Sequence, residues 1–159
     1  MLQIGVIGSG DAEEGEERAA EQVGREIARA GHILLCGGRG GVMEAAARGA
    51  RSEGGLTVGI LPGPYREEAN PHIAVAIATD MGHARNAIIA RSADALIAVG
   101  GGAGTLSEIA LGLKMGRPVI TIEDAPPRLL ISSEGIYHSR SPQEAVKLAE
   151  DMAQKTKEE

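Results

Sequence analysis

Apolar residues follow two alternating patterns along this chain of 159 residues. Short runs rich in valine, isoleucine and leucine are typical of buried strands, whereas apolar residues three or four positions apart are typical of amphipathic helices. The strand pattern covers residues 2–7, 32–36, 56–61, 72–78, 95–99 and 118–122. The helix pattern begins at 13–17, covers 42–53 and 84–91, follows the glycines at 100–104 as far as 115, and resumes at 141.

Apolar strands that alternate with helices predict a parallel sheet covered on both faces. We therefore expect an α/β fold: a single doubly wound, mainly parallel, Rossmann-like sheet with helices on both faces. The length of 1–159 is typical of a single domain. Ser141 and Pro142 suit the cap and the first position of the last helix. The tail from about residue 153 is expected to fray.

Composition excludes several classes of partner. The formal net charge is −6 and the chain has no tryptophan or phenylalanine, so it lacks the basic and aromatic surface that nucleic-acid binding uses. The N-terminus has no secretory leader pattern, and no apolar run is long enough to span a membrane. Cys36 is the only cysteine, which fits a reducing compartment. We expect a cytoplasmic protein with neither a nucleic-acid nor a membrane partner.

The densest motif is the glycine-rich turn at 100–104, which joins a predicted strand to a predicted helix. Glycine lets the backbone take positive φ angles and approach a ligand closely. The helix N-terminus offers unpaired N–H groups and the positive end of the helix dipole, which favour an anion such as phosphate. A phosphorylated small molecule is therefore the predicted ligand. Its predicted contacts in this turn are Gly101, Gly102, Ala103, Gly104 and Thr105.

Two further glycine-rich turns, at 8–10 and 37–41, also follow predicted strands. In a parallel sheet ligands bind beyond the carboxyl ends of the strands, so all three turns are expected at one edge. None matches the dinucleotide fingerprint or a Walker A motif. The turn at 37–41 is either a second phosphate or ribose cradle with Arg39 as charge partner, or a loose connection with Arg39 in solvent. The predicted contacts from these two turns are Gly8, Ser9, Gly37, Gly38, Arg39 and Gly40.

Polar side chains near these turns carry alternative interpretations. Arg85 and Asn86 fall in the first turn of a predicted helix, where the dipole disfavours a cation, so an anionic ligand would explain the arginine. The alternative is a surface arginine paired with Asp80 or Glu108. Glu108 itself either forms a capping box with Thr105, or polarises a water or stabilises a developing sugar cation.

The remaining residues that could carry chemistry indicate no cofactor site. The four histidines are dispersed without ligand spacing, so no metal site is predicted. Of the four lysines, Lys147, Lys155 and Lys157 lie in the last helix or tail, and Lys114 lies late on its helix. A pyridoxal phosphate Schiff base therefore has no anchor near the glycine-rich turns.

Together these motifs resemble those of a known superfamily. It contains the LOG-type cytokinin-activating phosphoribohydrolases, the molybdenum cofactor carrier proteins and, more distantly, the DprA/Smf proteins. The resemblance spans most of residues 2–122 and is carried by segments 36–44, 59–62, 85–87, 92–95 and 100–108. It implies a homodimer or homotetramer that binds a nucleotide or molybdenum cofactor and requires no other cofactor. Some members carry a lysine decarboxylase label, which the positions of the lysines do not support.

By matching positions, the resemblance implies that Arg85 and Glu108 would be the catalytic pair of a LOG-type enzyme. Such enzymes release a base and ribose 5-phosphate from a nucleoside 5′-monophosphate. The chain departs from that motif at Gly100, where the family has proline, and at Ser107 and Asn86. We therefore expect binding of a phosphorylated nucleotide-like or molybdopterin-like molecule, as a carrier or sensor. A LOG-like phosphoribohydrolase is the alternative.

Overall fold

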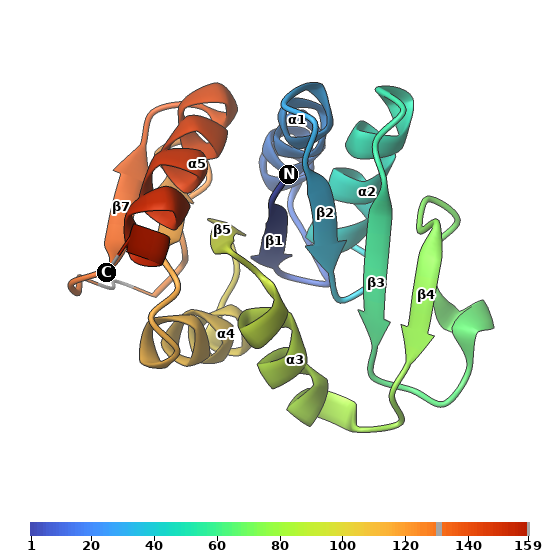
Figure 1. Cartoon of the computed structure of the whole chain (residues 1–159). Helices are drawn as coiled ribbons and strands as arrows, with labels where there is room; N and C mark the ends of the chain where they lie inside the picture. Colours follow the sequence, from blue (N-terminus) through green and yellow to red (C-terminus); the bar gives the residue numbers. More distant parts are fainter. Residues whose placement is uncertain (130–131, 159) are drawn as a thin grey trace.

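The computed structural model describes residues 1–129 and 132–158, and its centre is one sheet of seven parallel strands in the order β4-β3-β2-β1-β5-β6-β7 (Figure 1). The strands are β1 (Gln3–Gly8), β2 (Ile33–Cys36), β3 (Thr57–Leu61), β4 (Val75–Ala78), β5 (Ala95–Val99), β6 (Val119–Ile122) and β7 (Ile136–Ser139). The α-helices are α1 (Glu14–Arg29), α2 (Val42–Ser52), α3 (Arg85–Ser92), α4 (Ala103–Lys114) and α5 (Pro142–Glu158). Two 3₁₀ helices, η1 (Arg66–Glu68) and η2 (Gly82–Ala84), flank β4 along the chain.

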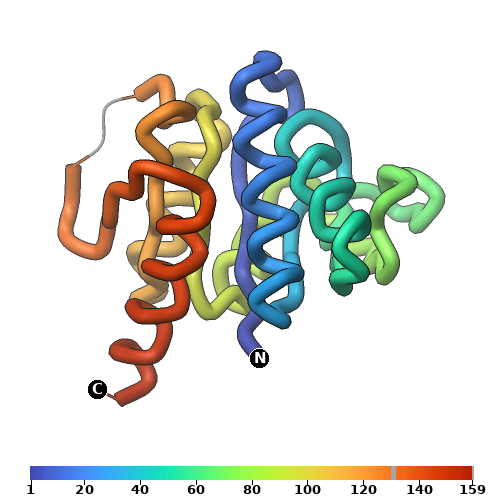
Figure 2. Tube along the Cα trace, turned by 90° about the horizontal axis from the view of Figure 1, so that it is seen from above, coloured from blue at the N-terminus to red at the C-terminus, as the bar shows by residue number. Residues whose placement is uncertain are grey.

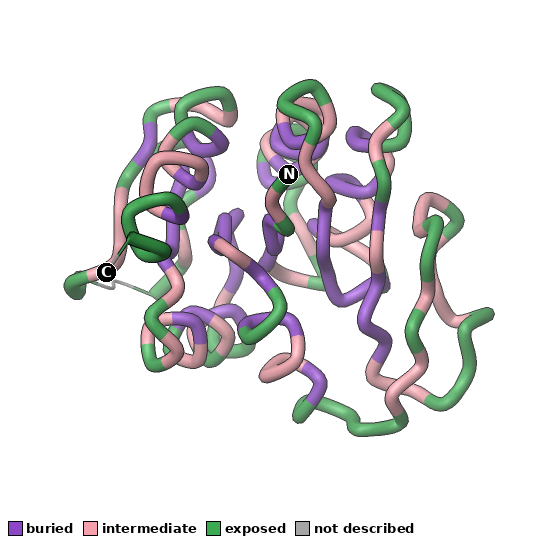
Figure 3. The backbone as a smooth tube through the Cα atoms, viewed as in Figure 1, coloured by how far each residue is buried: buried purple, intermediate pink, exposed green. Residues whose placement is uncertain are grey.

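The helices form one layer on each face of the sheet. On one face α1, α2 and α5 pack side by side, as Figure 2 shows, and contribute Val23, Ala46 and Ala149 to a core. On the other face α3 and α4 contribute Ile89 and Ile109 to a second core. The central strands β1 and β5 are buried between the two layers (Figure 3). The predicted α/β fold, doubly wound around a parallel sheet, is confirmed.

Two features near the C-terminus go beyond what the sequence pattern indicates. The sequence pattern does not predict β7, because this edge strand has only four residues and its His138 is exposed. Helix α5 continues to Glu158, through the residues from about 153 where fraying is predicted. Lys157 anchors the last turn of α5 through an ion pair of 2.9 Å with Asp94. The predicted helix start is confirmed, with the N–H of Glu144 donating to Oγ of Ser141 at 3.2 Å.

Apolar residues on α3 and α4 face more than one direction. Ile89 and Ile109 are buried against the sheet, whereas Ile88 and Leu113 are only half-buried.

No helix in the described part of the chain combines the length and the apolar character needed to cross a bilayer.

The carboxyl ends of β1 and β5 mark the switch point of the sheet. From β1 the chain adds β2, β3 and β4 on one side, and then crosses back to place β5 on the other side of β1. The connections that leave β1 and β5 lead into α1 and α4, which cover opposite faces. Adjacent strands whose connections diverge in this way leave a crevice, where doubly wound proteins bind ligands.

Candidate functional site

The turn between β5 and α4 lies at the switch point, and two of its glycines are required by its conformation. Gly100 and Gly101 have φ angles of 56° and 89°, which other residues rarely adopt. A Cβ on Gly100 would overlap the carboxylate of Glu16, and one on Gly101 would overlap the side chain of Thr105. The turn therefore needs glycine at both positions.

Helix α4 begins directly after these two glycines. Its N-cap is Gly102, and no side chain caps it. Thr105 is therefore the third residue inside the helix, and it is buried. The capping-box interpretation of Thr105 and Glu108 is wrong, because it requires Thr105 as the N-cap, whereas α4 begins at Ala103 and its N-cap is Gly102. The N–H groups of the first turn are left without a side-chain partner.

A cavity of about 370 Å³ lies over the start of α4, and its volume is in the range of small-molecule sites. Residues from the end of β1, from α2, α3 and α4, and from the connections after β1, β5 and β6 line it. They are Gly8, Ser9, Gly10, Met43, Arg85, Asn86, Gly102, Ala103, Gly104, Thr105, Glu108 and Arg128. The structure thus brings most of the predicted contacts together at one cavity.

Arg85, the first residue of α3, connects two strands to this cavity. Its Nη1 donates to the carbonyl oxygen of Gly37 at 2.6 Å and also to the carbonyl of Ile60, which ties the ends of β2 and β3 together. Its Nε donates to the amide oxygen of Asn86 at 2.7 Å. Arg85 is only 9% exposed, so its interpretation as a surface arginine is wrong. Nη2 has no hydrogen-bond partner in the described residues, and the side chain lines the cavity.

Glu108 lies further along α4 and lines the same cavity. Burial raises the pKa of its carboxyl to about 7, and the positive charge of Arg85 partly opposes that rise. Burial also lowers the pKa of Arg85, which the charge of Glu108 partly opposes. A carboxyl that is partly protonated near neutral pH can donate a proton or a hydrogen bond to a bound molecule.

Gly102 and Gly104 differ from the two glycines before them. Neither has a positive φ, and a Cβ added to either would meet no atom within 4 Å. Both glycines line the cavity. Protein packing therefore explains the lack of a side chain at neither position, and at Gly104, which lies inside the helix, backbone conformation does not explain it either. Its effect is to leave the N-terminus of α4 open to the cavity.

The second glycine-rich turn, at 37–41, packs against protein instead. A Cβ on Gly37 would lie 2.7 Å from Nη1 of Arg85, and one on Gly38 would lie 3.2 Å from Cα of Gly59. This turn does not contribute to the lining of the cavity. The predicted contacts that lie outside the cavity are Gly37, Gly38, Arg39, Gly40 and Gly101.

Arg39 lies within this second turn, and Cys36 directly precedes it. Arg39 is exposed, and its Nη1 pairs with a carboxylate oxygen of Glu68 at 3.2 Å. Cys36 is buried, and its Sγ accepts a hydrogen bond from the N–H of Gly38 at 3.4 Å. Burial raises the pKa of the Cys36 thiol to about 11, so it is a neutral core group. In the part of the chain that the structure describes, no three His, Cys, Asp or Glu residues are grouped to hold a metal ion.

Arg128 and Glu16 belong to the site although the sequence pattern does not reveal them. Arg128 lines the cavity, and its Nη2 lies 3.0 and 2.9 Å from the two carboxylate oxygens of Glu16. Glu16 is only 7% exposed. The two residues are 112 positions apart, so no local spacing could link them.

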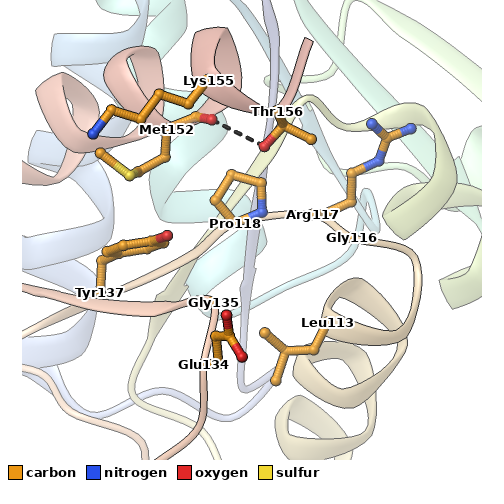
Figure 4. A pocket seen from close by; sticks show the side chains of 10 residues that line it. All are labelled: Leu113, Gly116, Arg117, Pro118, Glu134, Gly135, Tyr137, Met152, Lys155 and Thr156. Atoms are coloured by element: carbon orange, nitrogen blue, oxygen red, sulfur yellow. Dashed lines mark hydrogen bonds between the residues drawn. The ribbon is translucent and has the colours of Figure 1, made fainter. Parts of the chain in front are cut away.

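A second cavity, of about 440 Å³, lies at the other end of the sheet, beside the first residues of β6 and β7 (Figure 4). Its charged groups do not converge. Figure 4 shows the guanidinium of Arg117 and the ammonium of Lys155 pointing away from the cavity in different directions. The guanidinium of Arg117 donates to the carbonyl of Arg91 at 2.8 Å. The cavity at the switch point is therefore the better candidate for a charged ligand.

A parallel, doubly wound sheet with a helix N-terminus and a buried arginine at its switch point defines a Rossmann-like protein whose cavity suits an anion. The chain belongs to the SLOG cluster4 family, whose model matches residues 1–156. It is 52% identical over 146 residues to an uncharacterised protein of Archaeoglobus fulgidus, and this match covers 92% of the chain and 93% of that protein.

Proteins of the predicted superfamily are similar to the chain, which confirms the resemblance. The molybdenum cofactor binding protein from Rippkaea orientalis has a TM-score of 0.87 and 38% identity, and 95% of this chain and 96% of that chain are covered. The molybdenum cofactor carrier protein from Chlamydomonas reinhardtii has a TM-score of 0.83 and 33% identity, with 96% and 98% covered.

Two further matches concern the other branches of that superfamily. A cytokinin riboside 5′-monophosphate phosphoribohydrolase of Mycobacterium tuberculosis is 41% identical over 93 residues, which cover 57% of this chain and 50% of that protein. DNA processing protein A from Streptococcus pneumoniae shares the fold alone, with a TM-score of 0.74 at 18% identity over 92% of this chain and 61% of that chain.

Proposed function

We propose that this protein binds a phosphorylated small molecule, nucleotide-like or molybdopterin-like, in the cavity at the switch point, as a carrier or sensor. The phosphate would lie over the start of α4, where the free N–H groups and the helix dipole favour an anion. Nη2 of Arg85 would add a charged donor from α3. Asn86 would keep the guanidinium in place through its bond to Nε.

The observation that carries this proposal is the open space beside Gly102 and Gly104. Both positions lack a side chain although neither φ nor packing demands it. Space left at a helix N-terminus, next to a nine-tenths buried arginine with a free donor, is what a bound phosphate needs.

The ligand class is supported by the similar proteins. The proteins from Rippkaea orientalis and Chlamydomonas reinhardtii are described as binding or carrying the molybdenum cofactor, and each is similar to this chain over nearly its whole length. The match to the phosphoribohydrolase of Mycobacterium tuberculosis supports a nucleotide-like ligand, over a shorter part of the chain. Identification of small molecules that copurify with the protein, by mass spectrometry, would distinguish the two classes.

A matched pair of glycine substitutions tests the binding site. Gly104 and Gly15 each occupy the second position of a helix, and a Cβ on Gly15 would meet only the end of Arg18, at 3.9 Å. In calorimetric titrations with nucleoside 5′-monophosphates and molybdopterin, Gly104→Val should weaken binding about tenfold or more, equivalent to roughly 1.4 kcal/mol. Gly15→Val should bind as the wild type does. Unchanged affinity in Gly104→Val would overturn the proposed site.

A second candidate function, hydrolysis of a nucleoside 5′-monophosphate, is favoured by the position of Glu108. Its carboxyl lines the cavity and is partly protonated near neutral pH, which suits assistance to a departing base. A chromatographic assay would follow free base and ribose 5-phosphate. Base release that disappears in Glu108→Gln, with binding retained, would assign the hydrolase function. No release from any nucleotide would favour the carrier or sensor.

We also propose that the chain forms a homodimer or homotetramer. Val75, Ile77 and Met81 are 45%, 46% and 49% exposed, and Ile88 and Leu113 on α3 and α4 are only half-buried. Exposed apolar side chains in such number favour burial against another copy. Light scattering after size exclusion should give a multiple of the chain mass of 16.4 kDa. A monomer mass would contradict this proposal.

A further inference from the structure

The segment that follows β6 is fastened to the glycine-rich turn by two main-chain hydrogen bonds. The N–H of Gly100 donates to the carbonyl of Ala125 at 2.7 Å, and the N–H of Arg128 donates to the carbonyl of Gly101 at 2.8 Å. These bonds fix the backbone of Arg128 beside the start of α4. The same turn therefore places both the helix N-terminus and Arg128 at the cavity.

Glu16 holds the guanidinium of Arg128 through a single nitrogen. Nη2 contacts both carboxylate oxygens of Glu16, at 3.0 and 2.9 Å, and lies 3.9 Å from the carboxylate of Glu13. The carboxylate of Glu16 rests against Gly100, where no side chain is present. Nη1 and Nε of Arg128 have no partner among the described residues, and 43% of the side chain is exposed. The guanidinium is thus anchored while two of its nitrogens stay available to a ligand.

We propose that Arg128 is a second ligand-binding arginine of this cavity, positioned by Glu16, and that it selects ligands with a terminal phosphomonoester. This inference rests on the proposed function and deepens it. A phosphomonoester has three unesterified oxygens and close to two negative charges, whereas a diester has two such oxygens and one charge.

Donors reach the cavity from three elements. The N–H groups at the start of α4 come from one side, Nη2 of Arg85 comes from α3, and Nη1 and Nε of Arg128 come from the segment after β6. Three sets of donors match the three oxygens of a monoester. A diester would leave one set of donors without a charged acceptor, which weakens binding.

The test uses methyl phosphate and dimethyl phosphate as probes, followed through the backbone amide signals of Gly102 and Gly104. The wild type should bind methyl phosphate more tightly than dimethyl phosphate. Arg128→Met should weaken methyl phosphate binding about tenfold or more, because a charge-assisted hydrogen bond is lost, and should reduce the preference over the diester. Arg18→Met is the matched control, since Arg18 pairs with Glu14 at 2.8 Å on the same helix as Glu16 but lies outside the cavity.

A double variant separates ligand contact from structural support. In Arg128→Met alone, the buried carboxylate of Glu16 keeps its hydrogen bond from the N–H of Glu13 but loses its charged partner, which would disturb the turn at Gly100. Glu16→Gln combined with Arg128→Met removes that charge. The double variant should remain as weak as Arg128→Met. Recovery of wild-type affinity in the double variant would overturn the proposal.

The outcomes for the wild type and for Arg128→Met point to different failures. Equal affinity of these two proteins for methyl phosphate would overturn the role of Arg128 and leave the proposed function standing. Absence of binding by the wild type, with no shift of the Gly102 and Gly104 signals, would overturn the proposed function and this inference together.

Discussion

Two turns of this protein have almost the same glycine content for different physical reasons. In the turn at 37–41, protein atoms occupy the space beside the glycines, including the guanidinium of Arg85 next to Gly37. In the turn at 100–104, Gly102 and Gly104 face open space in a cavity. Glycine density in a sequence therefore predicts a close approach, but the folded chain decides whether protein or a ligand makes that approach.

The largest contrast should appear in stability. Gly41 has a φ angle of 63°, and a Cβ there would overlap the backbone of Ser9 and Gly10. Gly41→Ala should therefore lower the free energy of unfolding by about 3 kcal/mol. A Cβ at Gly102 would meet no atom within 4 Å, and the φ angle there is not positive. Gly102→Ala should therefore change the free energy of unfolding by less than about 0.5 kcal/mol. Urea denaturation measures both, and equal losses would remove the distinction between the two turns.

An intermediate effect is expected from Glu108, which lies on the helix that follows the turn at 100–104 and lines the same cavity. The pKa of its carboxyl is about 7 in the folded protein and near 4.5 in the unfolded chain, so folding favours the protonated form. That contribution to stability is complete below pH 4.5 and is lost as the pH rises through about 7. Glu108→Gln should match the wild type near pH 4 and be more stable at pH 8 by at most about 3 kcal/mol. Thermal unfolding at the two pH values checks this.

The same titration should affect ligand binding. A negative charge on Glu108 repels a bound phosphate, so the affinity of the wild type for methyl phosphate should fall as the pH rises through about 7. In Glu108→Gln this part of the pH dependence should disappear. A pH profile that is identical in the two proteins would mean that Glu108 does not face the ligand.

The smallest effect is expected at Arg39, in the turn at 37–41. Its ion pair with Glu68 is exposed and spans 3.2 Å, so Arg39→Ala should change the free energy of unfolding by less than about 0.5 kcal/mol. Calorimetric titration should show no change in phosphate affinity, because Arg39 does not line the cavity. A tenfold loss of affinity would instead identify the turn at 37–41 as a second cradle and would end the contrast between the turns.

Much of the fold could be predicted because its signals are local. The apolar runs of the central strands, such as Ala95–Val99, are buried on both faces, and a short run of this kind beside a glycine-rich turn is typical of a parallel strand. The strand Ile136–Ser139 escaped prediction because an edge strand with polar residues lacks that signal. The last turn of the last helix makes an ion pair between Lys157 and Asp94, which lie far apart in the sequence, so no local pattern reveals this contact.

The residues of the candidate site also differ in whether a local sequence signal reveals them. The turn at 100–104 and Arg85 could be predicted, since glycine content and an arginine at a helix start are visible in the sequence. The pairing of Glu16 with Arg128 could not, because it forms only when α1 and the segment after β6 meet over Gly100. The capping box failed for a local reason, the start of α4 at Ala103.

Arg85 carries a consequence for comparisons between related proteins. Its guanidinium bonds to the carbonyls of Gly37 and Ile60, so it supports the ends of two strands whether or not a ligand is bound. A lineage that lost the ligand would still be under selection to retain this arginine for folding. Its presence in a homologue is therefore a weak sign of function. The two unfilled positions, Gly102 and Gly104, would be free to acquire side chains, and they are the better markers of a site still in use.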